Sequence, residues 1–129
     1  MGKHSFKEQR AHERHHVKEG AFVVIKKQHD TKLTVGQIID ISNGGLSLKY
    51  LAESEQIKGN HKLDVYFSGC GLQIKDVSFK TIRDFGLESS FPFSSIVVRR
   101  GCIQFQRLEH EHKNQLDHFI QTYTNAGKN

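Results

Sequence analysis

The sequence predicts an all-β fold, a small barrel followed by one helix. Between Ala21 and about Leu108, short apolar runs with a period of two alternate with turns rich in Gly, Asn and Asp. Runs of this length and period are typical of strands, and a regular succession of them indicates a barrel or a sandwich. Only the last segment changes to a helical period. We therefore expect a six-stranded antiparallel β-barrel with a C-terminal α-helix and a flexible N-terminal arm.

The first two strands are expected at residues 21–26 and 32–42. The run AFVVIK is apolar and β-branched, which favours a strand. In KLTVGQIIDIS, alternate positions carry apolar side chains, and we expect these on the core face. They are Leu33, Val35, Ile39 and Ile41. Gly36 and Ile38 depart from that alternation, so Gly36 is predicted to mark a β-bulge.

The later strands follow from the same two signals, turn residues and alternation. The tripeptide NGG at 43–45 predicts a tight turn, and GLSLKYL at 45–51 predicts the next strand. HKLDVYFSG at 61–69 predicts another. The run 71–86 is long enough for one bent strand or two strands, and 96–108 completes the set. In the long run we expect Leu72, Ile74, Val77, Phe79 and Ile82 on the core face.

The segment from about Glu109 to Asn125 has the period of an amphipathic helix. Its apolar stripe, at i, i+3, i+4 and i+7, is Leu116, Phe119, Ile120 and Tyr123. One such stripe needs a single apolar partner surface. We expect the helix to cover one opening or face of the barrel.

The N-terminal arm, residues 1–18, is polar and more basic than acidic, and it holds four of the nine histidines. It has no apolar stripe, so we expect it to be mobile until a ligand orders it. The predicted organisation is therefore this arm followed by one domain, the barrel and helix of residues 19–125. A length of 129 residues agrees with one domain.

Net charge, cysteines and hydropathy indicate which partners and which compartment to expect. The formal net charge of +5 favours an anionic partner, such as a nucleic acid, an acidic protein or a phosphorylated small molecule. Cys70 and Cys102 form no CxxC pair, so we interpret both as reduced thiols. MGKHSFKEQR contains no apolar stretch, and no window has the length of a membrane span. We expect a cytoplasmic protein without a signal peptide or membrane insertion.

Two arginines, Arg10 and Arg14, stand four residues apart ahead of the first strand. A solvated basic tail accounts for them, and so does half of an anion-binding site. The histidines nearby, His12, His15 and His16, are interpreted as solvated side chains, because no predicted rigid element sets a metal geometry.

The second short pattern, Asp40-x-Ser42-x-x-Gly45, ends the second predicted strand. A β-turn explains the composition, because Asp, Ser, Asn and Gly all favour turns. It does not explain why a carboxylate and a hydroxyl share one parity, which would place them about 7 Å apart on one face. Gly45, with Gly44 beside it, allows a group to approach the backbone closely.

RxxxR ahead of the first strand and DxSxxG after the second together resemble the PilZ domain family of bacterial cyclic di-GMP receptors. RRGCIQFQRLEHEHKNQLDHFIQTY is similar to the closing strand and helix of that family. The resemblance covers about residues 9–124. It implies that Arg10 and Arg14 contact guanine edges and phosphates, that Asp40 contacts a guanine, and that Ser42 holds the phosphate side. Gly45 would be the position of closest approach.

Some positions depart from the family pattern or lie outside it. Family members often carry an arginine where this chain has Gln9, and glutamine there favours one bound ligand molecule over a stacked pair. The secondary candidates for ligand contact are Gln9, Gly44 and Arg83. Arg83 is placed near the pocket rim, although we interpret it, like Arg99 and Arg100, first as an exposed charge on the barrel.

The chemistry of guanine supports an Arg–Asp site independently of the resemblance. Guanine presents O6 and N7 as acceptors, which one arginine satisfies together. Its N1–H and N2–H donors suit one carboxylate, whereas adenine would turn an acceptor toward Asp40. Several such contacts reach about −8 kcal/mol, a micromolar affinity, and part of that offsets the entropy of ordering the arm. Binding is therefore expected to act as a switch toward an unidentified effector protein.

Other functions remain open on sequence alone. A PilZ-type adaptor that binds no ligand would share the fold, but the intact motifs argue against it. An OB-like nucleic-acid binder needs a stripe of aromatic and basic residues, which the predicted strands lack. No nucleophile–base pair, metal-ligand spacing or phosphate loop indicates an enzyme. We expect no cofactor or metal, a monomer or weak dimer, and an output among motility, biofilm or exopolysaccharide synthesis.

Overall fold

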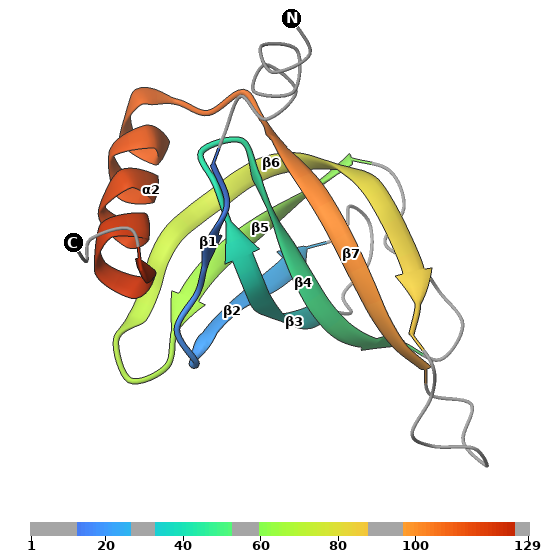
Figure 1. Ribbon diagram of the computed structural model, residues 1–129. Helices are drawn as coiled ribbons and strands as arrows, with labels where there is room; N and C mark the ends of the chain where they lie inside the picture. Colours follow the sequence, from blue (N-terminus) through green and yellow to red (C-terminus); the bar gives the residue numbers. More distant parts are fainter. Residues whose placement is uncertain (1–12, 27–32, 53–59, 88–96, 126–129) are drawn as a thin grey trace, which may run out of the picture.

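The computed structural model describes residues 13–26, 33–52, 60–87 and 97–125 (Figure 1). These residues form seven strands and one α-helix. In chain order they are β1 His15–His16, β2 Ala21–Lys26, β3 Leu33–Ile41, β4 Gly45–Ala52, β5 Asn60–Phe67, β6 Gly71–Gly86, β7 Val97–Gln106 and α2 His110–Tyr123.

Six of the strands close into an antiparallel barrel in the order β3-β2-β5-β6-β7-β4, and β4 pairs back onto β3. The predicted six-stranded barrel with a C-terminal helix is confirmed. The short strand β1 is an addition to it and pairs with β3 beyond the point where β2 stops. The core residues of β4 and β5 alternate as expected, with Leu46, Leu48, Leu63 and Val65 fully buried.

The expected core face of β3 is right for Ile41 and wrong for Leu33, Val35 and Ile39, of which Ile39 is partly buried but outside the core. Leu33 and Val35 are 60% and 56% exposed, whereas Gly36 and Ile38 are buried. The bulge lies between Ile38 and Asp40 rather than at Gly36, and the extra residue returns Ile41 to the core. Gly36 serves packing instead, because a Cβ there would lie 2.3 Å from Cδ1 of Leu48.

The long run at 71–86 forms one bent strand, β6, with register shifts against both neighbours. Asp76 has a φ of 56°, and its backbone N–H donates to the Asp64 carboxylate at 2.8 Å. Lys26 pairs with both carboxylates. Burial lowers the pKa of Lys26, but its hydrogen bonds to Asp76 and Asp64 outweigh burial and raise the pKa above its usual value. Leu72 and Ile82, expected on the core face, are exposed, and the register of β6 shifts beside each of them.

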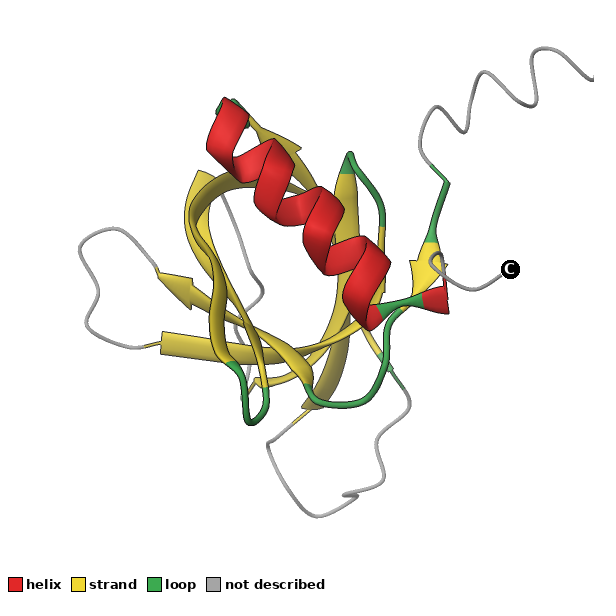
Figure 2. Cartoon of the chain, turned by 90° about the vertical axis from the view of Figure 1, so that its left-hand side faces the viewer, coloured by secondary structure: helices red, strands yellow, loops and turns green. Residues whose placement is uncertain are grey.

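Helix α2 lies against one side of the barrel (Figure 2). The predicted stripe is confirmed, because Leu116, Phe119 and Ile120 are buried in the common core. Tyr123 stacks on Phe67 with ring centres 4.1 Å apart. No helix among the described residues has the length and apolar character that crossing a membrane requires.

The last residues of the predicted arm are part of the barrel. Val17 is 5% exposed, and its N–H donates to the carbonyl of Ile39 at 3.1 Å. The next residue, Lys18, donates its N–H to the carbonyl of Tyr123 at 2.8 Å. Val17 was assigned to the mobile arm because residues 1–18 have no apolar stripe, but its single apolar side chain packs in the core. Residues 1–12 lie outside the described part.

A substitution at Gly45 tests whether the close packing of β4 against β7 leaves room for a side chain. A Cβ at Gly45 would lie 2.1 Å from the carbonyl oxygen of Ile103, a backbone atom in a paired strand. We expect Gly45→Ala to lower the free energy of unfolding by about 1–3 kcal/mol or more, as overpacking does. Chemical denaturation measures this. Gln104→Ala, at the exposed position paired with Gly45, should stay within about 0.5 kcal/mol of the wild type. Equal stability of Gly45→Ala and the wild type would contradict the prediction.

Candidate functional site

Asp40 lies immediately after the bulge in β3 and faces out of the barrel. Its cross-strand partners are His16 on β1 and Ser47 on β4. The Asp40 side chain is 21% exposed, and its Oδ1 accepts a hydrogen bond from Nη1 of Arg14 at 2.7 Å. The bulge therefore presents this carboxylate to Arg14 and β1, which lie within the predicted arm.

Arg14 joins the two sequence motifs. It precedes β1, is 51% exposed, and pairs with Asp40 across 26 positions of sequence. The structure thus brings one arginine of RxxxR onto the carboxylate of DxSxxG, so that the two motifs meet at one place. A half-exposed ion pair of this kind is worth about 0–1 kcal/mol, so a ligand can replace it at low cost. The other arginine, Arg10, and its neighbour Gln9 lie outside the described residues.

Ser42 is used by the turn between β3 and β4. It is 5% exposed, and its Oγ accepts the N–H groups of Gly44 at 3.1 Å and Gly45 at 3.2 Å. The Ser42 N–H in turn donates to the carbonyl of Gly45 at 2.8 Å. The predicted turn is confirmed, and the hydroxyl expected to share a face with Asp40 is instead buried in internal hydrogen bonds.

The two glycines of the turn fit it against β7. The absent side chain of Gly45 makes room for the carbonyl of Ile103, and the carbonyl of Gly44 accepts the N–H of Phe105 at 2.9 Å. The group that approaches the backbone at Gly45 is therefore a strand of the barrel itself. The DxSxxG pattern in this chain encodes a turn geometry as well as a charged group.

Arg100 on β7 is a residue of this site that the sequence reasoning missed. Its Nη2 lies 3.4 Å from Oγ of Ser47 and 3.8 Å from Oδ2 of Asp40. Its neighbour Arg99 faces the interior, with 12% of the side chain exposed, and binds Asp84 at 2.8 Å. That hydrogen bond raises the pKa of Arg99 further. The interpretation of both arginines as exposed barrel charges is wrong for Arg99.

A signal for this division was present in the sequence. In the last strand the apolar residues Ile103 and Phe105 alternate with Gln104 and Gln106. Extending the same parity backward through Gly101 places Arg99 inside and Arg100 outside.

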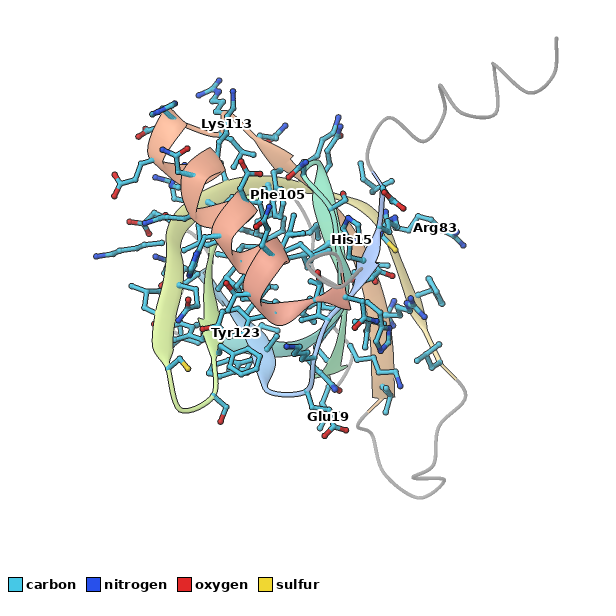
Figure 3. The ribbon with its side chains drawn as sticks, turned by 60° about the vertical axis from the view of Figure 1, so that its left-hand side comes forward. His15, Glu19, Arg83, Phe105, Lys113 and Tyr123 are labelled. Atoms are coloured by element: carbon cyan, nitrogen blue, oxygen red, sulfur yellow. The ribbon has the colours of Figure 1, made fainter. Side chains whose placement is uncertain are left out.

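Arg83 projects outward from β6 (Figure 3), with its guanidinium 5.3 Å from the ring centre of Phe85. The register places it on the same row as Asp40, through Ser47 on β4 and Cys102 on β7. Three strand spacings separate Arg83 from Asp40, which is about 14 Å. The structure does not bring Arg83 onto the carboxylate, so it remains a candidate for the rim.

The described residues include no group of three or more His, Cys, Asp or Glu side chains that is placed to hold a metal ion. His15 and His16 belong to β1, where they pair with Ile41 and Asp40 of β3. His12 lies outside the described residues.

The role of Ser42 can be tested by stability. Ser42→Ala leaves the buried N–H of Gly45 and the half-buried N–H of Gly44 without their acceptor, so we expect the free energy of unfolding to fall by about 1–3 kcal/mol. Asn43→Ala, at the exposed position of the same turn, is the control and should change it by less than about 0.5 kcal/mol. Thermal and chemical denaturation check both. Equal effects of the two substitutions would refute a turn-holding role for Ser42.

The chain was compared with known families and structures. A family model described as PilZ domain matches residues 8–122. The PilZ domain of YcgR from Escherichia coli, solved with c-di-GMP, superposes with a TM-score of 0.70 and 14% identity, over 89% of this chain and 91% of that one. The MrkH–c-di-GMP complex of K. pneumonia gives 0.59 and 13%, over 86% of this chain and 50% of that one.

Two of the matched structures, those of YcgR and MrkH, contain longer chains that extend beyond the region shared with this chain. The chain covers 44% of the YcgR chain in its complex with c-di-GMP from Escherichia coli, at a TM-score of 0.59 and 16% identity. It also spans half of MrkH. Among curated proteins, no sequence matches this chain. At these identities the structural likeness shows the fold.

Proposed function

The chain belongs to the PilZ domain family, and on this premise we propose that it is a bacterial receptor that binds cyclic di-GMP and thereby regulates a partner protein. The observation that carries the proposal is the contact between Arg14 and Asp40, which unites RxxxR and DxSxxG at one place. Relatives of the same fold have been solved with c-di-GMP bound. The proposed role is that of a receptor and not of an enzyme.

The Asp40 carboxylate suits the Watson–Crick edge of guanine. Its two oxygens can accept N1–H and N2–H together, and adenine offers no equivalent pair of donors. Once the ligand occupies the carboxylate, the guanidinium of Arg14 is released to bind guanine O6 and N7 or a phosphate. Arg10 is assigned the second such role by its place in the motif alone.

The remaining motif residues act on the ligand by shaping the turn. Ser42 holds the N–H groups of Gly44 and Gly45, and Gly45 seats the turn on β7. These contacts support a positioning role for Ser42 and Gly45 beside the ligand. Gln9, in place of arginine, favours one bound ligand molecule per chain.

The hydrogen bonds after Arg14 suggest how binding reaches a partner. Three residues beyond it, Val17 forms a bridge with Thr124, and Lys18 donates to the carbonyl of Tyr123 at the end of α2. The Lys18 Nζ also donates to the carbonyl of Thr122 at 3.3 Å. A ligand that displaces Arg14 therefore acts on a segment that is hydrogen-bonded to the end of α2. We propose that the arm and the end of α2 together form the surface that contacts the partner protein.

Calorimetric titration tests ligand binding. We expect the wild-type protein to bind cyclic di-GMP with micromolar or tighter affinity, at about one molecule per chain, and to bind cyclic di-AMP far more weakly. Asp40→Asn should weaken binding by about 1–3 kcal/mol, because the amide turns a donor toward the guanine edge. Asp117→Asn, an exposed position on α2, is the charge-matched control and should bind as the wild type does.

No heat with cyclic di-GMP at tens of micromolar, in protein shown to be folded by circular dichroism, would reject the receptor proposal. The ligand-free adaptor of the same fold would then be favoured. Equal binding of both cyclic dinucleotides would reject the assigned role of Asp40.

A backbone NMR titration tests the connection to the helix. We expect the amide resonances of Lys18 and Thr124 to shift with cyclic di-GMP together with those of β3, because the bonds above join them. The amides of Val24, which pairs with Val35 five residues before Asp40, and of Asp64 on β5 should move little. If the shifts are confined to β3 and β4 and the amides of α2 do not move, the proposed connection between the ligand site and the helix is wrong.

A further inference from the structure

We propose that Arg100 is a third arginine of the ligand site and that it binds a phosphate of cyclic di-GMP. The inference rests on the proposed function and adds to it a residue outside both sequence motifs. The two motifs lie in the arm, in β3 and in the turn after β3. The proposal adds β7 to the elements that contact the ligand.

The geometry places Asp40 between two guanidinium groups. Arg14 reaches Oδ1 from the side of β1 at 2.7 Å, and Arg100 lies 3.8 Å from Oδ2 on the side of β4 and β7. The second distance is too long for a hydrogen bond, so it is a Coulombic contact that leaves Oδ2 able to accept a donor from a ligand. A base that docks on the carboxylate consequently has an arginine at each side.

Arg100 is also held ready for an anion. Its Nη2 is placed by Oγ of Ser47 at 3.4 Å, and its side chain is 35% exposed. A guanidinium has five N–H donors, and Ser47 uses one of them. Since the side chain is already positioned, less conformational entropy is lost when the remaining donors bind a phosphate.

The charges of the site favour the same assignment. Cyclic di-GMP carries one negative charge on each of its phosphodiesters. Asp40 neutralises one arginine of the motif, so Arg10 and Arg14 alone would leave one of the ligand's charges unmatched. Arg100 supplies the missing cation, whereas Arg83 stands three strands away on the same row.

The test compares Arg100→Gln, Arg100→Lys and Lys49→Gln by calorimetry with cyclic di-GMP. Lys49 is exposed and directly opposite Arg100 on β4, so its substitution removes the same charge from the same face. A charge-assisted hydrogen bond is worth about 1.5–3 kcal/mol. We therefore expect Arg100→Gln to weaken binding roughly tenfold to hundredfold and Arg100→Lys to weaken it less. Lys49→Gln should stay within about twofold. Thermal melts of the unliganded variants check that each is folded.

The salt dependence of the affinity separates direct binding from an effect through Asp40. Salt screens the attraction between a cation and a phosphate, so Arg100→Gln should make the affinity fall less steeply with salt, while Arg100→Lys preserves the slope. A loss of affinity with an unchanged slope would show that Arg100 only positions Asp40, which overturns the inference.

The two proposals fail differently. If the wild type binds and Asp40→Asn does not, while Arg100→Gln binds as the wild type does, only the assignment of Arg100 is overturned. If the folded wild type does not bind cyclic di-GMP, both proposals fall together.

Discussion

The bulge between Ile38 and Asp40 in β3 determines which side of the barrel the carboxylate meets. Ile38 is buried, so in a regular strand Asp40 would share its face and place a charge in the core. The extra residue turns Asp40 outward and returns Ile41 to the interior, which satisfies the charge and the core at once. The Arg14 contact, the approach of Arg100 and the turn at Ser42 all follow from that one change of phase.

Strand count, helix and closure were predictable because they depend on average alternation over many residues. The phase of β3 was not, because Leu33 and Val35 are apolar yet exposed, and alternation alone cannot show where an extra residue enters. Gly36 was a misleading sign, since its missing side chain accommodates Leu48 rather than a bulge. The role of Val17 was hidden for a similar reason, because a single valine makes no periodic pattern.

The sequence predicted which charged residues of the candidate site meet, but not which motif residues are used by the turn. The motifs named Asp40 and Arg14, and the structure joins them. They did not show that Ser42 and Gly45 are occupied by the turn, because the same residue types serve turns and ligands alike. Arg100 stands outside any motif, and only the register of β7 against β4 brings it toward Asp40.

The weakness of the Arg14–Asp40 ion pair agrees with the proposed receptor role. A half-exposed ion pair contributes about 0–1 kcal/mol, whereas a bidentate contact to a guanine contributes about 1–3 kcal/mol. The pair therefore holds Arg14 near β3 without competing seriously with a ligand. Because Val17 and Lys18 fasten the following segment to Thr124 and Tyr123, a displacement of Arg14 meets a fixed point only a few residues away. In the proposed switch, a small movement at the carboxylate would therefore be passed along β1 to the end of α2.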